Sequence, residues 1–462
     1  MFLNHNEEPN FSINRFESML KTNDILFFDS IEFENIIHHY LDLGKLSLAK
    51  KAIRLGLDQH PQSTQLLLFK VEVSIMENKL GDANQILNKL EQIEPSNEEI
   101  YIQKANIYSK RDDHKTAIQL LKKALHLSKD LSDVHALLAM EYMFEEDFDN
   151  AKIHYMACLK DDPEDYASLH NVIYCFDVLG ENKQAIEFLL NYLDKNPYCE
   201  VAWHQLGKAY NKEGNLNKAL EAFDYALLAD EYFMGAYFEK GKVLEKMNRI
   251  QEAIRNYQIT LELEDPSAYA YLRIGKCYEK LEILDVALHY LQKATTEDPL
   301  LDKAWLAITD FFYKQKNYRK ALYFIEKAIE IDQENVRYWK LYAKINHKLN
   351  FLEEAEKGYK QSIELGNYEL ETWIAHANVL IEIGEVESAL SVMKKAEEFY
   401  PESEEVIYRL AALYFLNNKG TLGYKYLVKA LEINKEFLTV IYPLFKTIFD
   451  RPSIQDIIKS YQ

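Results

Sequence analysis

Residues 203–227 read WHQLGKAYNKEGNLNKALEAFDYAL, and this stretch predicts two short helices joined by a turn at Gly214. Apolar and small residues recur three or four positions apart on each side of that glycine: Trp203, Leu206 and Tyr210 before it, and Ala219, Phe223 and Ala226 after it. This spacing gives each helix one buried stripe. The stretch therefore predicts a helix pair packed face to face.

The helix pair repeats along the chain with a period of 34 residues. Steps of 34 from Ala49 meet an alanine eleven times before they reach Gly423: Ala49, Ala83, Ala117, Ala151, Ala185, Ala219, Ala253, Ala287, Ala321, Ala355 and Ala389. Two helices need a residue this small where their backbones approach most closely. The column therefore predicts the same helix packing in every repeat.

Two further columns keep this register. Every residue four positions after the small-residue column is apolar or aromatic, from Ile53 to Leu427. The first helices supply an aromatic column: Tyr40, Tyr108, Tyr142, Phe176, Tyr210, Tyr278, Phe312 and Tyr414. Buried stripes of this kind predict a continuous core shared by neighbouring repeats.

Turn residues also follow the period. Residues that tolerate a left-handed backbone stand between the two helices of many pairs: Gly44, Asn78, Gly180, Gly214, Asn248, Asn350, Gly384 and Asn418. Prolines, which end helices, mark the repeat boundaries: Pro61, Pro95, Pro163, Pro197, Pro299 and Pro401. Helices and turns thus alternate without an insertion.

These residues resemble the tetratricopeptide repeat, whose pattern W-x2-L-G-x2-Y…A-x3-F is matched by Trp203 to Phe223. The resemblance implies an all-α, right-handed superhelical α-solenoid of the bacterial type that consists of this repeat alone. We expect about twelve repeats over residues 30–437, with capping segments at 1–29 and 438–462. Larger side chains at the small position of the first helix, Ile37, Val71 and Ile173, predict altered packing in three repeats.

The ends of the chain carry their own helix signals. Phe16, Met19 and Leu20 predict a short helix with an inward apolar face, and Asp29 with Glu32 resembles a capping box. Leu438, Ile441, Phe445 and Ile448 recur at helical spacing and predict a half-repeat, which Pro452 separates from a final short helix.

Composition limits the functions available to the chain. Its 462 residues carry a formal net charge of -20, so we expect no general binding to nucleic acid or to anionic membranes. Residues 1–10 lack the basic and apolar regions of a secretory signal, and no apolar run is long enough to insert into a membrane. Four widely spaced cysteines favour reduced thiols and a cytoplasmic location.

Resemblance to the family places ligand-facing residues at the second, fifth, ninth, twelfth and thirteenth positions of each repeat. In repeats six to ten these positions hold Glu245, Glu279 and Asp310 against a larger basic set: Lys208, Lys212, Lys242, Lys246, Lys276, Lys280, Lys303, Lys314, Arg337, Lys340, Lys344 and Lys348. A groove lined by one sign of charge attracts a partner of the opposite sign. The alternative is a solvated lysine face.

The same positions in repeats one to five are acidic and apolar, and those in the last two repeats include Tyr408, Phe415 and Leu416. Four neighbouring residues, Met140, Met143, Phe144 and Tyr174, form a candidate site for a hydrophobic side chain. Packing against the adjacent repeat is the other interpretation of these four residues.

The sequence contains none of the familiar motifs for phosphate, metal or acyl chemistry, so we predict no catalytic residues, cofactor or metal. We expect a non-enzymatic scaffold that binds an extended, acidic segment of a protein partner in the concave groove. The alternative is a regulatory or sensor subunit of a signalling or transcription system that changes curvature when it binds a peptide. The sequence does not indicate an oligomeric state.

Overall fold

The computed structural model describes residues 9–22, 26–128, 131–263 and 267–461. Within these ranges the chain forms α-helices and one short 3-10 helix, and it forms no strand. The all-α prediction is therefore confirmed. The first eight residues, on which most of the expectation about a secretory signal rests, lie outside the described ranges.

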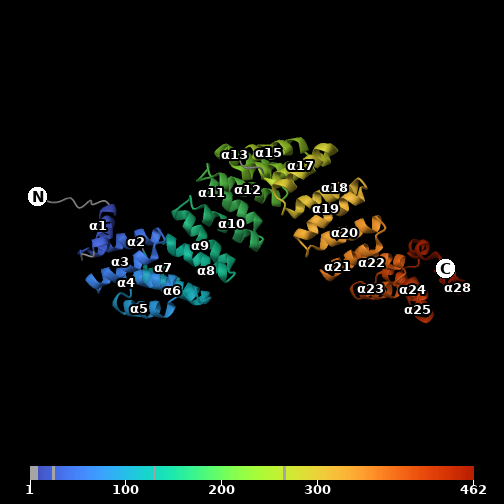
Figure 1. Ribbon diagram of the computed structural model, residues 1–462, viewed down its shortest axis with the longest axis horizontal. Coiled ribbons are helices and arrows are strands. Elements are labelled where there is room, and N and C mark those ends of the chain that lie inside the picture. The colour runs from blue at the N-terminus through green and yellow to red at the C-terminus, as the bar shows by residue number, and fades with distance from the viewer. Residues whose placement is uncertain (1–8, 23–25, 129–130, 264–266, 462) are drawn as a thin grey trace. The chain divides into compact units, whose positions relative to one another are not determined.

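The chain, whose helices are labelled in Figure 1, divides into two compact units, of which the first is Met1–Glu231. Its helices are α1 (Pro9–Thr22), α2 (Ser30–Asp42), α3 (Leu46–Gln59), α4 (Thr64–Met76), α5 (Leu80–Ile93), α6 (Glu98–Ser109), α7 (His114–Leu127), α8 (Ser132–Phe144), α9 (Phe148–Asp161), α10 (Tyr166–Leu179), α11 (Asn182–Leu193), α12 (Glu200–Lys212) and α13 (Leu216–Ala229).

The second unit is Tyr232–Gln462. It contains α14 (Met234–Lys246), α15 (Ile250–Leu263), α16 (Ala268–Lys280), α17 (Leu284–Glu297), α18 (Asp302–Lys314), α19 (Tyr318–Ile331), α20 (Val336–Lys348), α21 (Leu352–Glu364), α22 (Leu370–Ile383), α23 (Val386–Phe399), α24 (Glu404–Leu416), α25 (Gly420–Asn434), α26 (Leu438–Ile441), η1 (Tyr442–Phe445), α27 (Lys446–Phe449) and α28 (Pro452–Ser460).

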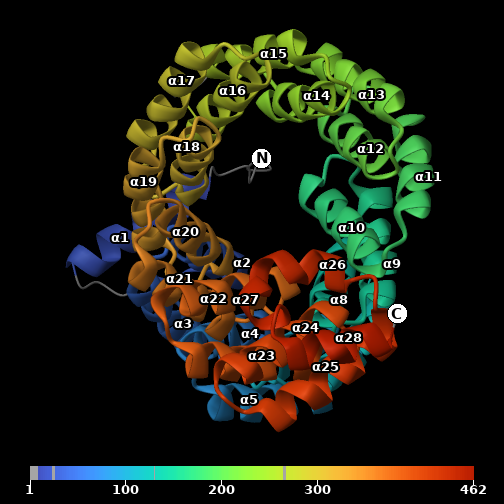
Figure 2. The same cartoon turned by 90° about the vertical axis from the view of Figure 1, so that its right-hand side faces the viewer.

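From α2 to α25 the helices form successive pairs with the predicted period. In the first unit the first helices of successive pairs begin at Ser30, Thr64, Glu98, Ser132, Tyr166 and Glu200, and in the second unit at Met234, Ala268, Asp302, Val336, Leu370 and Glu404. Within the second unit, α14, α16 and α18 lie on the inner side of the curve and α15, α17 and α19 on the outer side (Figure 2).

Small residues allow the two helices of a pair to touch. A Cβ atom added to Gly207 on α12 would lie 2.5 Å from the ring of Phe223 on α13, and one added to Gly241 would lie 2.6 Å from the ring of Tyr257. Both rings are fully buried. Since real Cβ atoms do not approach other atoms this closely, each ring occupies the volume that a larger residue would need.

The predicted turn residues all adopt the left-handed conformation. Each of the eight glycines and asparagines named from the sequence has a positive φ, between 53° at Asn418 and 96° at Gly384. Asp112, whose residue type also tolerates this conformation, adopts it in the same register, and so do three residues whose types do not favour it: Glu146, Glu282 and Lys316. The turn geometry is thus set by the helix pair and not by the residue type.

At its N-terminal end the first unit is covered by α1. Phe16 is fully buried, and its ring centroid lies 6.0 Å from that of Phe28 and 6.4 Å from that of Phe33. The predicted capping box is confirmed, because Asp29 accepts the backbone N–H of Glu32 and Glu32 accepts that of Asp29.

The C-terminal helices α26 and α27 pack against α24. Ile441 and Phe449 form one buried cluster with Tyr408 and Phe415 of α24. Tyr408 and Phe415 were predicted to line the groove, and that prediction is wrong, because the C-terminal helices cover both side chains. Apolar residues at this face therefore complete the core of the last helix pair.

Candidate partner-binding surface

Ion pairs connect the first helices of neighbouring repeats in both units. In the second unit Lys280 Nζ lies 3.0 Å from Glu245 and Lys314 Nζ lies 2.7 Å from Glu279. In the first unit Lys212 Nζ lies 3.1 Å from Asp177. Each lysine reaches a carboxylate 35 residues earlier in the chain. We call these contacts the ion-pair ladder.

Glu245 is the most enclosed acid of the ladder. It is buried, and its carboxylate accepts a hydrogen bond of 2.8 Å from the Tyr257 hydroxyl. Arg273 lies 2.8 Å and Lys280 3.0 Å from the same carboxylate. Four groups on α14, α15 and α16 are thereby held together, and the Glu245 charge is matched by two cations.

Lys276 differs from its neighbours, because it forms no ion pair with any residue in the described ranges. It lines a cavity of 710 Å³ between α16 and α18, together with Asp310 and Lys314. Burial lowers the pKa of Lys276, and the charge of Arg273 lowers it further. Burial likewise raises the pKa of Asp310, whose carboxylate lies 3.6 Å from Arg337.

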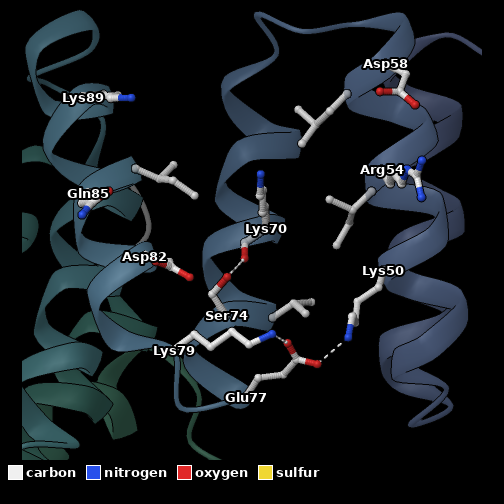
Figure 3. A pocket seen from close by; sticks show the side chains of 14 residues that line it. Lys50, Arg54, Asp58, Lys70, Ser74, Glu77, Lys79, Asp82, Gln85 and Lys89 are labelled. Carbon is white, nitrogen blue, oxygen red and sulfur yellow. Dashed lines mark hydrogen bonds and ion pairs between the residues drawn. The ribbon is translucent and has the colours of Figure 1, made fainter.

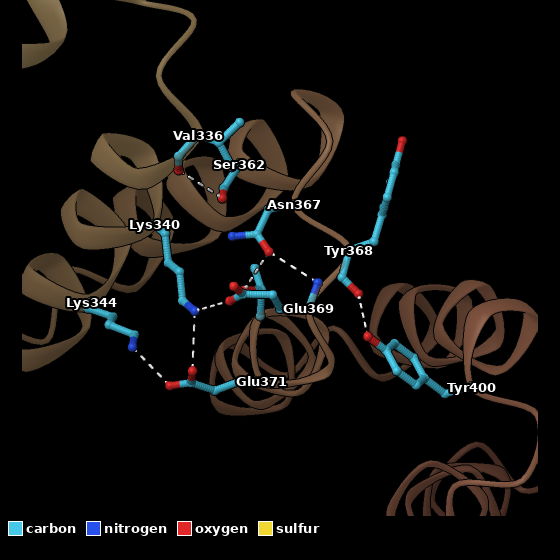
Figure 4. A network of polar contacts seen from close by, with 10 residues as sticks. Val336, Lys340, Lys344, Ser362, Asn367, Tyr368, Glu369, Glu371 and Tyr400 are labelled. Atoms are coloured by element: carbon cyan, nitrogen blue, oxygen red, sulfur yellow. Dashed lines mark hydrogen bonds and ion pairs between the residues drawn. The ribbon is translucent and has the colours of Figure 1, made fainter. Parts of the chain in front are cut away.

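Farther along the second unit, two predicted groove lysines meet acids at and just after the boundary with the next repeat (Figure 4). Lys340 Nζ lies 2.5 Å from Glu369 and 3.2 Å from Glu371, and Lys344 Nζ lies 2.8 Å from Glu371. The hydrogen bond from Lys344, followed by that from Lys340, holds the pKa of Glu371 below its usual range.

The remaining basic residues of the predicted set are divided between paired and unpaired positions. Lys242 Nζ lies 2.8 Å from Glu239 on its own helix. Lys208 and Lys348 form no ion pair with residues that the structure describes, and Lys246 lies at the end of α14. Sequence reasoning missed Glu239 and Glu369, because neither occupies one of the five groove positions.

The apolar candidates lie on α8 and α10 of the first unit, and three of the four are exposed. Met140 is 48% exposed, Phe144 61% and Tyr174 46%. Met143 packs against the core instead, with its Sδ atom 3.6 Å from Cys175 Sγ. The structure therefore presents a smaller apolar surface than the sequence predicts.

The Phe144 ring packs against a neighbouring imidazole. Its ring stacks on His114 with a centroid separation of 4.8 Å and an interplanar angle of 15°. His114 Nδ1 in turn lies 2.8 Å from the buried carboxylate of Glu141. An exposed ring held in this way loses little side-chain entropy when another molecule covers it.

Within the described ranges, no three His, Cys, Asp or Glu side chains gather in a way that would hold a metal ion. All four cysteines are free and buried, and burial raises the pKa of the Cys158 thiol, which makes it inert. None of the helices in the described part of the chain has the length and apolar character needed to cross a bilayer.

Helix pairs of 34 residues, stacked with small residues at each crossing, define an α-solenoid of the tetratricopeptide type. Models described as "Tetratricopeptide repeat" match residues 74–141 and 284–345, residues 238–302, and residues 132–165 and 201–232. The chain belongs to the tetratricopeptide-repeat family. A search of curated proteins finds no match to it.

Solved structures of other repeat proteins show similarity at low sequence identity. The chain is similar to Cut9-Hcn1 of the APC/C (13% identity, TM-score 0.40), with 87% of this chain and 93% of that chain covered. It is similar to a tetratricopeptide repeat protein of Parabacteroides merdae (16%, TM-score 0.42), with 54% and 98% covered. It is also similar to pilF of Pseudomonas aeruginosa (18%, TM-score 0.38), with 45% and 94% covered.

Proposed function

We propose that the chain is a non-enzymatic scaffold whose first helices α14, α16, α18 and α20 bind an extended, acidic segment of a partner protein. The observation that carries this proposal is the unpaired ammonium group of Lys276 in the cavity between α16 and α18. A partly buried cation that makes no ion pair is costly, and a carboxylate from a partner at contact distance would reduce that cost.

The pattern of pairing around Lys276 supports an acidic ligand. Lys314 is matched by Glu279, and Lys280 shares Glu245 with Arg273, so both lysines already have a carboxylate in contact. Within the described ranges Lys208 and Lys348 are unpaired as well, but Lys276 is the one of the three that lines this cavity, and Asp310 beside it is engaged by Arg337. One carboxylate side chain of the partner therefore has a defined position, and the rest of the segment follows the surface of the first helices.

In the first unit, Met140, Phe144 and Tyr174 support a second anchor point. Their exposed apolar surface would gain about 25 cal/mol for each Å² that a partner side chain covers. The four free, buried cysteines support a cytoplasmic location for the scaffold.

Lys276→Glu tests the proposal, with Lys357→Glu as the matched control. The control makes the same charge change at an exposed site on the second helix α21. The probe is a fluorescein-labelled peptide of alternating glutamate and serine, and its binding is measured by fluorescence anisotropy at 50 mM and 200 mM salt. We expect Lys276→Glu to weaken binding at least tenfold and the control to change it less than twofold. Equal effects of the two changes would refute the proposed role of Lys276.

A further inference from the structure

An aromatic side chain at the eleventh position of many repeats fills the space between successive second helices. Each of these rings packs against the residue twelve positions later in its own repeat: Tyr142 on His154, Phe176 on Phe188, Tyr278 on Tyr290, Phe312 on Phe324 and Tyr414 on Tyr426, with centroids 5.1–5.9 Å apart. The ring and its partner thus close the outer surface between two repeats.

A lysine from the preceding repeat often covers the ring. Lys122 Nζ lies 5.5 Å from the centroid of Tyr142, and Lys152 Nζ lies 4.8 Å from that of Phe176. These lysines occupy the twenty-fifth and twenty-first positions of their repeats. A cation above a ring face is stabilised by the ring's quadrupole, so ring and cation form one unit.

The repeat formed by α4 and α5 lacks this ring, because its eleventh residue is Ser74 (Figure 3). The Ser74 hydroxyl donates a 2.8 Å hydrogen bond to the carbonyl of Lys70 in its own helix. The residue in the place of the partner ring is Ile86. A cleft of 620 Å³ lies at this position between α3, α4 and α5.

A second cleft lies at another departure from the aromatic column. In the repeat formed by α22 and α23 the eleventh residue is Leu380, and a cleft lined by the equivalent positions has a volume of 360 Å³. Leucine fills part of the space of a ring, whereas serine fills almost none of it. The cleft at Ser74 is accordingly the larger of the two.

The cleft at Ser74 has an apolar floor and a basic rim. The floor consists of Ile53, Leu57, Val73 and Ile86. Glu77 binds two cations of the rim, with its carboxylate 2.5 Å from Lys50 Nζ and 2.7 Å from Lys79 Nζ.

Three further cations of the rim, Arg54, Lys70 and Lys89, form no ion pair with residues in the described ranges, although the carboxylates of Asp58 and Asp82 also line the cleft. Arg54 stands at the twenty-fifth position of its repeat, where Lys122 covers a ring in a later repeat. Here Arg54 lines a cleft whose lining residues include no aromatic ring (Figure 3).

We propose that this cleft binds a small aromatic anion, with its ring in the space left by Ser74 and its acidic group at Arg54, Lys70 and Lys89. The apolar floor favours a flat ring over a polar body. A guanidinium and two ammonium groups favour an anionic substituent through charge-assisted hydrogen bonds, and Arg54 stacks on the ring face. The site lies apart from the surface proposed for an acidic protein segment and does not depend on it.

Phenyl phosphate is the probe for this site, with inorganic phosphate and phenol as its two halves. Isothermal titration calorimetry measures the affinities, and saturation-transfer NMR detects contact with the ring. We expect phenyl phosphate to bind at least tenfold more tightly than either half. Equal affinity for phenyl phosphate and inorganic phosphate, or no binding of phenyl phosphate at millimolar concentration, would overturn the proposal.

Ser74→Tyr restores the ring and should abolish binding of phenyl phosphate, while Ser74→Ala leaves the cleft open and should retain it. If Ser74→Tyr disturbs the fold, as judged by circular dichroism, the double change Arg54→Gln with Lys89→Gln decides the question. That variant should bind phenyl phosphate at least tenfold more weakly. Unchanged affinity in a folded Ser74→Tyr protein or in the double variant would show that the ligand binds elsewhere.

Discussion

Lys316 offers a direct test of how the helix pairs are joined. It lies in the turn between α18 and α19 with a φ of 58°, and its exposed side chain makes no polar contact within the described ranges. A left-handed backbone costs an L-residue about 1–2 kcal/mol. Glycine avoids this cost, although it also stabilises the unfolded chain by about 0.5–1 kcal/mol. We expect Lys316→Gly to stabilise the α18–α19 pair by about 0.5–1 kcal/mol.

Hydrogen exchange measured by mass spectrometry suits this prediction better than a global unfolding curve, because long repeat arrays do not unfold as one cooperative unit. Peptides from residues 302–335 report the local opening of the pair. A gain of 1 kcal/mol lowers the open population about fivefold, so exchange of these amides should slow by about two- to fivefold. Peptides from α2 and α3 should be unaffected.

Gln315→Gly is the matched control for the turn. Gln315 is the preceding residue and has a right-handed φ of -82°, where glycine has no steric advantage. The control should therefore destabilise the pair by about 0.5–1 kcal/mol and accelerate exchange. If Lys316→Gly also accelerates exchange, or leaves it unchanged, the left-handed turn carries no strain and the reasoning is wrong.

Three further predictions concern packing and charge. Gly207→Val places a side chain against the ring of Phe223 and should destabilise its helix pair by about 1–3 kcal/mol. Hydrogen exchange in α12 and α13 should then be faster, and unchanged exchange would contradict the close approach of the two helices. Glu245→Gln removes the charge shared by two cations and should lower the free energy of unfolding by about 2 kcal/mol. An effect no larger than that of an exposed Glu→Gln change would contradict the buried network. The pKa of Glu371 is lowered by Lys344, so its stabilisation is present above the usual carboxyl pKa of about 4.3 and is lost as the pH falls further. Because the side chain is exposed, the loss should stay below about 1 kcal/mol, and Glu371→Gln should remove this part of the pH dependence of exchange in α20 and α22.

The helix pairs and their period are predictable from the sequence because each signal is local. Ala219 and Phe223 are both buried on the second helix α13, and the Phe223 ring lies against Gly207 of the first helix within the same pair. The turns show the limit of this reasoning. Lys316 and Glu146 adopt the same backbone as Asn350, but lysine and glutamate do not favour a positive φ, so only their place in the period identifies them.

The candidate surface depends on contacts that the sequence leaves open. A lysine at a groove position is visible in the sequence, whereas its meeting with Glu369 depends on how the loop before α22 is placed. Tyr408 occupies a groove position too, but helices that follow it in the chain cover it. The charge at one position can therefore be predicted from the sequence, whereas predicting the net charge of a surface requires knowledge of how neighbouring helices pack.

The ion-pair ladder has a mechanical consequence. Lys280 with Glu245, and Lys314 with Glu279, each connect one first helix to the next across the inner side of the second unit. Stretching this unit would lengthen these contacts. The ion pairs therefore add a weak resistance to extension to that of the apolar core. Dissolved ions screen charges that are exposed to water, as both lysine side chains are. The stiffness of the second unit should therefore fall as ionic strength rises, with no change in its helix content.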